Sequence, residues 1–208
     1  MDWVTISALA TAGGTLILAL ATFASVRSAN RAARVAERSL MQGLRPLLVP
    51  SRLQDPAEKI MFADQHWVKS SGGGGVAEAT ADAIYLAISL RNAGSGIAVL
   101  HGWHFTPDMT REAAHSDVSA FRRLTRDLYV PPSDLGFWQG AFREPSTPEF
   151  LAAGEAIRTR RPITIELLYG DQEGGQRTIT RFLLMPRDDG DWLASTSRHW
   201  NLDRPQPR

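Results

Sequence analysis

The sequence predicts a mainly β protein, in which an N-terminal transmembrane helix and a basic juxtamembrane helix precede one antiparallel β-sandwich. An immunoglobulin-like sandwich is the expectation, and a β-barrel is the alternative. Residues 3–26 contain no charged side chain, residues 27–44 are rich in alanine and arginine, and short alternating segments separated by turn residues follow. The expected boundaries are 1–26, 27–44 and 45–203 for these three parts, with a disordered tail at 204–208.

Length and composition allow one globular domain beside an anchor. The chain has 208 residues, of which 43% are hydrophobic, enough to bury a single core. The formal net charge of +1 gives no global electrostatic reason to bind nucleic acid, so no such partner is predicted. Cysteine is absent, which excludes disulfides, thiolate zinc sites and a cysteine nucleophile.

The uncharged stretch at residues 3–26 is long enough for a helix that crosses a hydrocarbon core of about 30 Å. A cleaved signal peptide is the main alternative, and Ala19-Leu20-Ala21 would suit a cleavage site. Only Asp2 precedes the stretch, however, where a signal peptide needs a positive charge. A surface-lying amphipathic helix would need a charged face, which this stretch does not have. The spanning helix is therefore the prediction.

Charges on the two sides of the span predict its orientation. Cationic flanks stay in the cytoplasm, and every cationic residue of this chain follows the span. The N-terminus is thus expected outside the cell and the C-terminal domain in the cytoplasm. Membrane lipid is a predicted partner, because each flanking arginine can contribute on the order of 1 kcal/mol with anionic headgroups. The predicted membrane-flanking residues are Trp3, Arg27, Arg31, Arg34 and Arg38.

Small residues follow one face of the predicted helices. Val26, Ala29, Ala33, Ala36 and Leu40 alternate at spacings of three and four, and small residues continue the same phase into the span. One interpretation is a parallel homodimer along this face. The other is that an alanine-rich helix offers such a face by chance, and both stay open.

Strand-like alternation replaces the helical period after residue 45. Ile84, Leu86, Ile88 and Leu90 alternate with other residues, which predicts a half-buried strand. The turn residues at 92–96 predict a hairpin into a returning strand. Strands are also predicted at residues 47–53, 59–63, 97–105, 124–130, 136–142, 163–167, 177–185 and 192–195.

Two segments of the domain depart from this strand pattern. Thr147 and Pro148 predict the start of a helix that ends at Arg158. Residues 70–75 contain four consecutive glycines, which predicts a flexible loop. A phosphate-binding loop is not expected there, because no Gly-Lys-Ser/Thr follows.

Several motifs resemble those of one group of proteins. They are Arg45-Pro46, Leu90-Arg91-Asn92-Ala93-Gly94-Ser95-Gly96-Ile97-Ala98, Tyr169-Gly170-Asp171 and Arg198-His199-Trp200-Asn201-Leu202-Asp203. With its N-terminal span and basic helix, the chain resembles uncharacterised single-pass membrane proteins of actinobacteria that carry a C-terminal β-sandwich-like domain. The resemblance would cover most of the chain. It implies this architecture and no particular activity.

The histidines do not form a recognised metal site. His101 and His104 are an odd number of positions apart, so on a strand they point to opposite faces unless a bulge intervenes. His101 is expected beside Trp103 at the edge of the core. His66 and His199 are each followed by a tryptophan, against which they are expected to pack. No metal is predicted.

The acidic residues likewise give no catalytic assignment. Asp188, Asp189 and Asp191 suit a hairpin turn and lack the distal glutamate of a calcium loop. No nucleophile elbow or dinucleotide fingerprint is present, so no catalytic residue and no cofactor are predicted. A noncontiguous acid/base pair stays open among Asp127, Asp134, Glu166 and Asp171.

Phe137 and Trp138 are the candidate binding surface. If they alternate on a strand, one of them points outward, and an exposed tryptophan favours a protein-binding surface. The alternative is that the long loop at residues 106–123 covers that face.

The predicted function is a membrane-anchored, non-enzymatic interaction or scaffold module with an unknown protein partner. A membrane-surface enzyme and an extracytoplasmic ligand-binding domain are the alternatives. A deep pocket with convergent polar groups would favour the enzyme, whereas a flat aromatic surface would favour binding.

Overall fold

The computed structural model describes residues 2–203; within the N-terminal helix, the side chains at positions 5, 10, 38, 41 and 42 are not described. The chain divides into two compact units, residues 1–43 and 44–208. The predicted tail at 204–208 lies outside the described residues.

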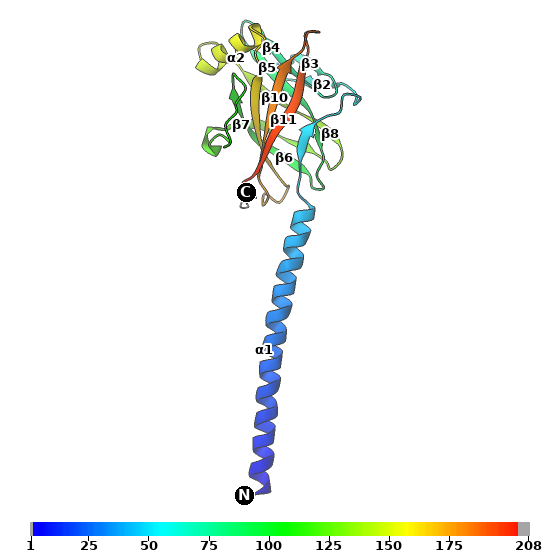
Figure 1. Cartoon of the computed structure of the whole chain (residues 1–208), viewed down its shortest axis with the longest axis vertical. Helices are drawn as coiled ribbons and strands as arrows, with labels where there is room; N and C mark the ends of the chain where they lie inside the picture. The colour runs from blue at the N-terminus through cyan, green and yellow to red at the C-terminus, as the bar shows by residue number, and fades with distance from the viewer. Residues whose placement is uncertain (1, 204–208) are drawn as a thin grey trace. The chain divides into compact units, whose positions relative to one another are not determined.

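The predicted span and juxtamembrane helix form one continuous helix, α1 (Trp3–Gly43) (Figure 1). Its hydroxyl side chains bond to carbonyl groups one turn earlier in the helix. Thr11 Oγ1 donates to Ser7 O at 2.9 Å, and Thr22 Oγ1 donates to Leu18 O at 2.7 Å. These bonds satisfy hydroxyl groups that lipid could not, so the threonines are compatible with a membrane span.

Among the described residues, α1 is the one helix that is long and apolar enough to cross a membrane. Within Ile6–Glu37, an 18-residue window has a mean hydropathy of 1.8, and none of that window is buried in the structure. This assignment rests on length and composition, which a signal sequence near an N-terminus would also satisfy. The predicted flanking residue Arg38 has no described side chain. The other four predicted flanking residues are described, and all are exposed: Trp3, Arg27, Arg31 and Arg34.

The second unit is mainly antiparallel β, which confirms the predicted fold class. Its helices are the short 3₁₀ helix η1 (Val118–Ala120) and α2 (Pro148–Arg158). Its strands are β1 (Leu48–Pro50), β2 (Glu58–Met61), β3 (Trp67–Ser70), β4 (Gly74–Ala79), β5 (Ile84–Asn92), β6 (Ala98–Thr106), β7 (Arg122–Val130), β8 (Leu135–Phe142), β9 (Ile163–Gly170), β10 (Thr178–Pro186) and β11 (Trp192–Asn201).

Nine of these strands form one curled sheet (Figure 1). The strand order is β1-β5-β4-β11-β10-β9-β6-β7, and β8 pairs with the edge of β5 opposite β4. Leu86, Leu100 and Phe182, from three separate strands, are fully buried in the core that the curled sheet encloses. The sheet therefore combines the facing layers of a sandwich with the continuous hydrogen bonding of a half-barrel.

The small β2–β3 hairpin forms a separate sheet over the outer face of β5. Ile60 and Val68 of the hairpin pack against Tyr85 and Ala87. As a result β5 is buried on both faces, and the prediction of a half-buried strand is wrong. Alternation identified the strand, but the extra layer that covers its second face comes from residues distant in the sequence.

The turn after β5 does not form the predicted hairpin, because β6 pairs with β7 and β9. Asn92 fixes the change of direction. Its Oδ1 accepts from the backbone N–H of Leu47 at 3.1 Å and of Gly94 at 3.0 Å, and its Nδ2 donates to Gly96 O at 2.7 Å and Val130 O at 2.9 Å. The asparagine of the Asn92-Ala93-Gly94-Ser95-Gly96 turn therefore stabilises the fold by bonding to the backbone around it.

The glycine-rich segment after β3 is closely packed, so its prediction as a flexible loop is wrong. Gly72, Gly73 and Gly74 are buried, and the segment joins two strands that the sequence did not predict, β3 and β4. A Cβ at Gly72 would lie 2.4 Å from Arg52 O, and Gly73 has a φ of +68°. Glycine is needed here because another part of the backbone passes too close for a side chain.

Other local predictions are confirmed. Helix α2 begins at Pro148, and the Oγ1 of Thr147 accepts a hydrogen bond from Phe150 N at 3.4 Å. Hairpins join β9 to β10 and β10 to β11 as expected, although β11 continues to Asn201.

Candidate functional site

Glu166 and Arg181 are the most deeply buried ion pair among the described residues. They face each other on β9 and β10, so the sheet itself sets their separation. Arg181 Nε and Nη2 lie 2.8 and 2.7 Å from Glu166 Oε1, and the two side chains are 5% and 2% exposed. Removing such charges from water is costly unless every donor and acceptor is satisfied.

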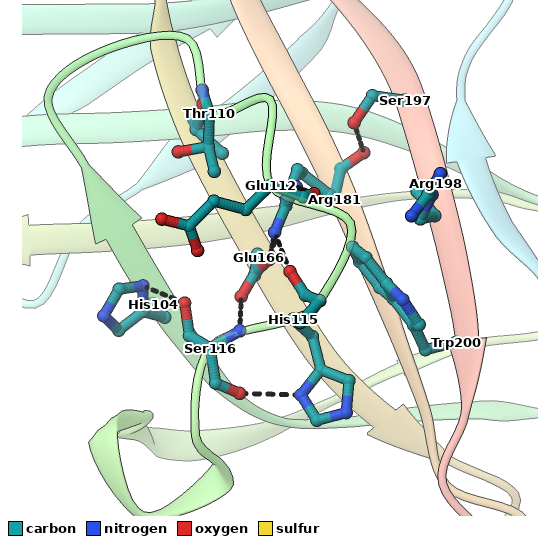
Figure 2. Close-up of polar contacts among 12 residues, drawn as sticks. His104, Thr110, Glu112, His115, Ser116, Glu166, Arg181, Ser197, Arg198 and Trp200 are labelled. Carbon is teal, nitrogen blue, oxygen red and sulfur yellow. Dashed lines mark hydrogen bonds and ion pairs between the residues drawn. The ribbon is translucent and has the colours of Figure 1, made fainter.

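The loop between β6 and η1 covers this pair and supplies its remaining hydrogen bonds (Figure 2). Arg181 Nη1 donates to Glu112 O at 2.7 Å, and Arg181 Nη2 donates to Ala114 O at 2.6 Å. Glu166 Oε2 accepts from the backbone N–H of Ser116 at 2.9 Å. Both charged groups are thus fully engaged in holding the loop to the sheet.

Trp200 completes this covered cluster from β11 (Figure 2). The guanidinium carbon of Arg181 lies 4.8 Å from its ring centroid, and that of Arg198 lies 5.8 Å away. Its Nε1 donates to Ala113 O at 3.3 Å, and His115 contacts the ring edge-on. The sequence motif that contains Trp200 therefore fastens the covering loop.

Ser116 and His104 are in contact beside the buried pair, and a serine next to a histidine is a feature of some catalytic sites. Ser116 Oγ lies 3.1 Å from His104 Nδ1 (Figure 2). A nucleophilic serine needs a histidine that is itself held by a third group, usually an acid. Glu166 bonds to Arg181 and to Ser116 N instead, and no hydrogen bond among residues 2–203 joins an acid to His104. The contact fastens the loop and supports no catalytic assignment.

One open part of the described domain is the seam between β7 and β8. These strands are the two ends of the curled sheet: within residues 2–203, β7 pairs with β6 alone and β8 with β5 alone. Their facing edges therefore carry backbone N–H and C=O groups without a ladder partner. A groove, here called the seam groove, lies between them, and Phe62 and Ala63 also line it.

Arginines form the rim of the seam groove. Arg122 and Arg123 come from β7, and Arg143 follows β8. Arg122 pairs with Glu149 at 3.3 Å and Arg143 with Asp64 at 3.4 Å, both in half-exposed positions where water screens the charges. No ion pair joins Arg123 to an acid within the described part of the chain.

The rim carboxyl groups have lowered pKa values. The backbone N–H of Glu149 at the start of α2 lowers the pKa of its carboxyl group, and Arg122 adds to this effect against partial desolvation. Desolvation acts to raise the pKa of Asp64, but hydrogen bonds from Tyr85 and the backbone, with the charge of Arg143, lower it overall. Both acids are therefore ionised at neutral pH and neutralise their arginine partners.

Trp103 and Gly140 form the floor of the seam groove. Trp103 meets the fully buried Trp138 edge to face at 5.3 Å, and the guanidinium of Arg122 lies 5.9 Å from the Trp103 ring. A Cβ at position 140 would lie 2.7 Å from Trp138 and 3.0 Å from Trp103. The floor is thus part of the main core.

The predicted binding surface at Phe137 and Trp138 is wrong as a surface. Trp138 is 0% exposed, and Phe137 is half-buried against the cluster beneath the β2–β3 hairpin. The two residues do alternate between faces. The outer face is covered by the β2–β3 hairpin, whereas the alternative expected the loop at residues 106–123 to cover it. The exposed tryptophan of the described domain is Trp67, on the hairpin itself.

The histidine predictions are also partly wrong. His101 lies at a bulge in β6 and is exposed rather than at the core edge. His66, which directly precedes β3, stacks on Tyr85 with ring centroids 4.0 Å apart, and not on Trp67. His199 lies 2.7 Å from Thr180 Oγ1, and desolvation lowers its pKa. Residues 2–203 contain no cluster of three or more histidine or acidic side chains that could hold a metal.

The four acids weighed as an acid/base pair do not come together. Glu166 pairs with Arg181. Asp171 accepts from Gly175 N at 2.8 Å in the turn after β9, and Asp134 accepts from the following backbone N–H. Asp127 lies on the exposed side of β7.

No protein-family model matches the chain, and a search of curated proteins finds no match to it. The resemblance to actinobacterial membrane proteins stays a prediction, and the site must be interpreted from its geometry.

Neither the seam groove nor the buried Glu166–Arg181 pair is predicted from the sequence. Residues 122–126, Arg-Arg-Leu-Thr-Arg, concentrate charge around the start of the strand predicted at residues 124–130, which is typical of an edge strand and could have indicated the seam. Arg181 directly precedes the apolar run Phe182-Leu183-Leu184-Met185 within its strand, which indicates a buried charge. Its acid partner could not be chosen from the sequence.

Proposed function

We propose that the chain is a membrane-anchored, non-enzymatic interaction module that binds a protein partner through the seam groove. The open seam is the observation that carries this proposal. Two end strands face each other without pairing, and the rim between them is lined with arginines. Unpaired strand edges are surfaces that other polypeptides use for binding. The buried Glu166–Arg181 pair, by contrast, is already saturated by the protein itself.

The proposal places the domain on the cytoplasmic side of the cell membrane, with α1 as the span. Arg27, Arg31 and Arg34 follow the apolar part of the helix, and cationic residues are retained on the cytoplasmic side. The homodimer through α1 stays a prediction. A periplasm-dependent reporter fused after Arg208 should be inactive, whereas a cytoplasm-dependent reporter there should be active. The reverse pattern would contradict this orientation.

Site-specific photo-cross-linking in intact cells tests the binding surface. A photoreactive amino acid at Thr125, which lines the seam groove, should link the full chain to a discrete partner protein. Arg158, exposed on α2, is the matched control position and should give no such product. Equal products at the two positions, or none at Thr125, would contradict the proposal.

A further inference from the structure

We propose that the partner supplies an extended, acidic segment, which adds as a strand to the free edge of β8 within the seam groove. This inference rests on the proposed interaction function and specifies the chemistry of its partner.

The free edge of β8 is regular enough to accept another strand. Its pairing with β5 runs without a register shift from Ile84↔Phe142 to Arg91↔Leu135. Every second residue of such a strand turns its N–H and C=O away from the existing partner, here toward the seam. The edge therefore presents a ready series of donors and acceptors.

Strand β7 does not fill this edge. Its ladder with β6 is interrupted between Leu128 and Arg123, where the intervening residues leave the regular pairing. The contact that spans the seam here is between side chains: with its amide turned to satisfy both neighbours, Gln139 donates to Met61 O at 3.2 Å and accepts from Arg126 Nη2 at 3.1 Å. Because these edges meet through an arginine side chain, they are farther apart than paired strands. An incoming strand would displace this contact between Arg126 and Gln139.

The charge of the seam selects an acidic segment. Arg123 and Arg126 are exposed on β7, and no ion pair joins either to an acid within residues 2–203. Arg122 and Arg143, by contrast, already have Glu149 and Asp64. Carboxylates are the natural ligands of unpaired guanidinium groups, with which they form charge-assisted hydrogen bonds.

The floor of the groove adds a pattern requirement. Side chains of an extended strand alternate between its faces. When every second residue is acidic and directed to the arginines, the residues between them face Gly140 and Trp103. Those residues should be small or β-branched, because a Cβ at Gly140 itself would already contact both tryptophans beneath it.

Peptide binding to the full chain in lipid nanodiscs tests the inference. The probe is a fluorescein-labelled ten-residue peptide of alternating threonine and glutamate, followed by fluorescence anisotropy. A threonine–lysine peptide and a threonine–glutamate peptide interrupted by prolines are the controls, since proline lacks the N–H that a ladder requires. The glutamate peptide alone should bind, and hydrogen exchange should show new protection of β8 amides.

Two double variants with the same change in net charge locate the site. Arg123→Gln with Arg126→Gln should weaken binding of the glutamate peptide about tenfold, through lost charge-assisted hydrogen bonds. Arg158→Gln with Arg187→Gln, at exposed arginines already paired with acids, should change it less than about twofold. All four positions are exposed, and unchanged thermal unfolding of each variant verifies the fold.

Each contrary outcome overturns the inference. These outcomes are no binding of the glutamate peptide, equal binding of the lysine or proline peptide, and equal loss in the two double variants. Tighter binding of a 20-nucleotide uridine RNA without β8 protection would identify a nucleic-acid surface instead. If the peptide fails while cross-linking at Thr125 persists, the acidic strand is wrong and the interaction function stands. If both fail, the proposed function fails as well.

Discussion

The β domain contains two clusters of arginine, tryptophan and glutamate, one from β9, β10 and β11 and the other from β6, β7 and α2. In the covered cluster, Arg181 is 4.8 Å from the Trp200 centroid and 2.7 Å from Glu166, and its side chain is 5% exposed. At the seam, Arg122 is 5.9 Å from the Trp103 centroid and 3.3 Å from Glu149, and its side chain is 44% exposed.

The difference between the clusters lies in what covers them. Carbonyl groups of the loop at residues 112–114 take up the free donors of Arg181, so that this arginine belongs to the folded core. No loop carbonyl in the described residues bonds to Arg122, which stays at the rim of an open groove. Similar side chains thus stabilise the fold at one site and present a charged surface at the other, because only the first is shielded from water.

Breaking the buried pair is expected to have the largest effect. Arg181→Met leaves Glu166 buried without a partner, which should lower the free energy of unfolding by about 3–5 kcal/mol. Chemical unfolding of the detergent-solubilised chain, followed by near-UV circular dichroism, measures this loss. The double variant Arg181→Met with Glu166→Leu should recover part of the stability, and a loss in the single variant below about 1 kcal/mol would refute the assignment of Arg181 to the core.

Gly140→Ala examines whether the floor of the seam belongs to the core although its rim does not. The added methyl group would collide with Trp138 and Trp103, so we expect a loss of about 1–3 kcal/mol in the same unfolding experiment. Gly175→Ala is the matched control, because a Cβ there meets nothing within 4 Å. Equal stabilities for the two variants would mean that the tryptophans beneath the seam are loosely packed.

Arg122→Met makes at the exposed Arg122–Glu149 pair the same change that Arg181→Met makes at the buried pair. Since this arginine and Glu149 are half-exposed, their pair should contribute no more than about 1 kcal/mol to the free energy of unfolding. A loss as large as that for Arg181→Met would erase the distinction between the covered cluster and the seam.

Asp203→Asn should have the smallest effect, at a further exposed pair. The hydrogen bond from Arg177 lowers the pKa of the Asp203 carboxyl group. Because the folded-state pKa lies below the unfolded one, the pair stabilises the fold above about pH 4, and this contribution is lost as the pH falls through the folded value. The variant should lose less than about 1 kcal/mol at pH 7 and show a shallower decline of stability in acid. An unchanged acid profile would show that the Asp203 carboxylate does not stabilise the fold.

Local pattern predicted much of the fold. Alternation located β5 and β9, and turn residues located the last two hairpins, because these signals depend on near neighbours. The second burial layer over Tyr85 and the packing of Gly72 against Arg52 O depend on segments that are brought together only by the tertiary fold. The sequence therefore predicts a flexible loop at the glycine run and an outward side chain at either Phe137 or Trp138.

The candidate site was less predictable than the fold. Trp138 could be placed on a strand but not assigned to the core, because the hairpin that covers one face of that strand was only partly recognised. Arg122 and Arg181 each lie in a strand that also contains apolar residues, so their sequence surroundings do not distinguish a surface arginine from a buried one. Whether a loop later covers such an arginine is decided by chain topology, and composition does not reveal it.

Hydrogen exchange of the free full-length chain, resolved by residue, tests most directly the claim that the seam is an open edge of the sheet. The amides of β9 and β10, which have ladder partners on both sides, should be the most protected. Alternate amides of β8 and those of the interrupted part of β7 should exchange far faster. Protection of β7 and β8 equal to that of β9 would show that the seam is closed, and would contradict both the binding surface and its proposed partner.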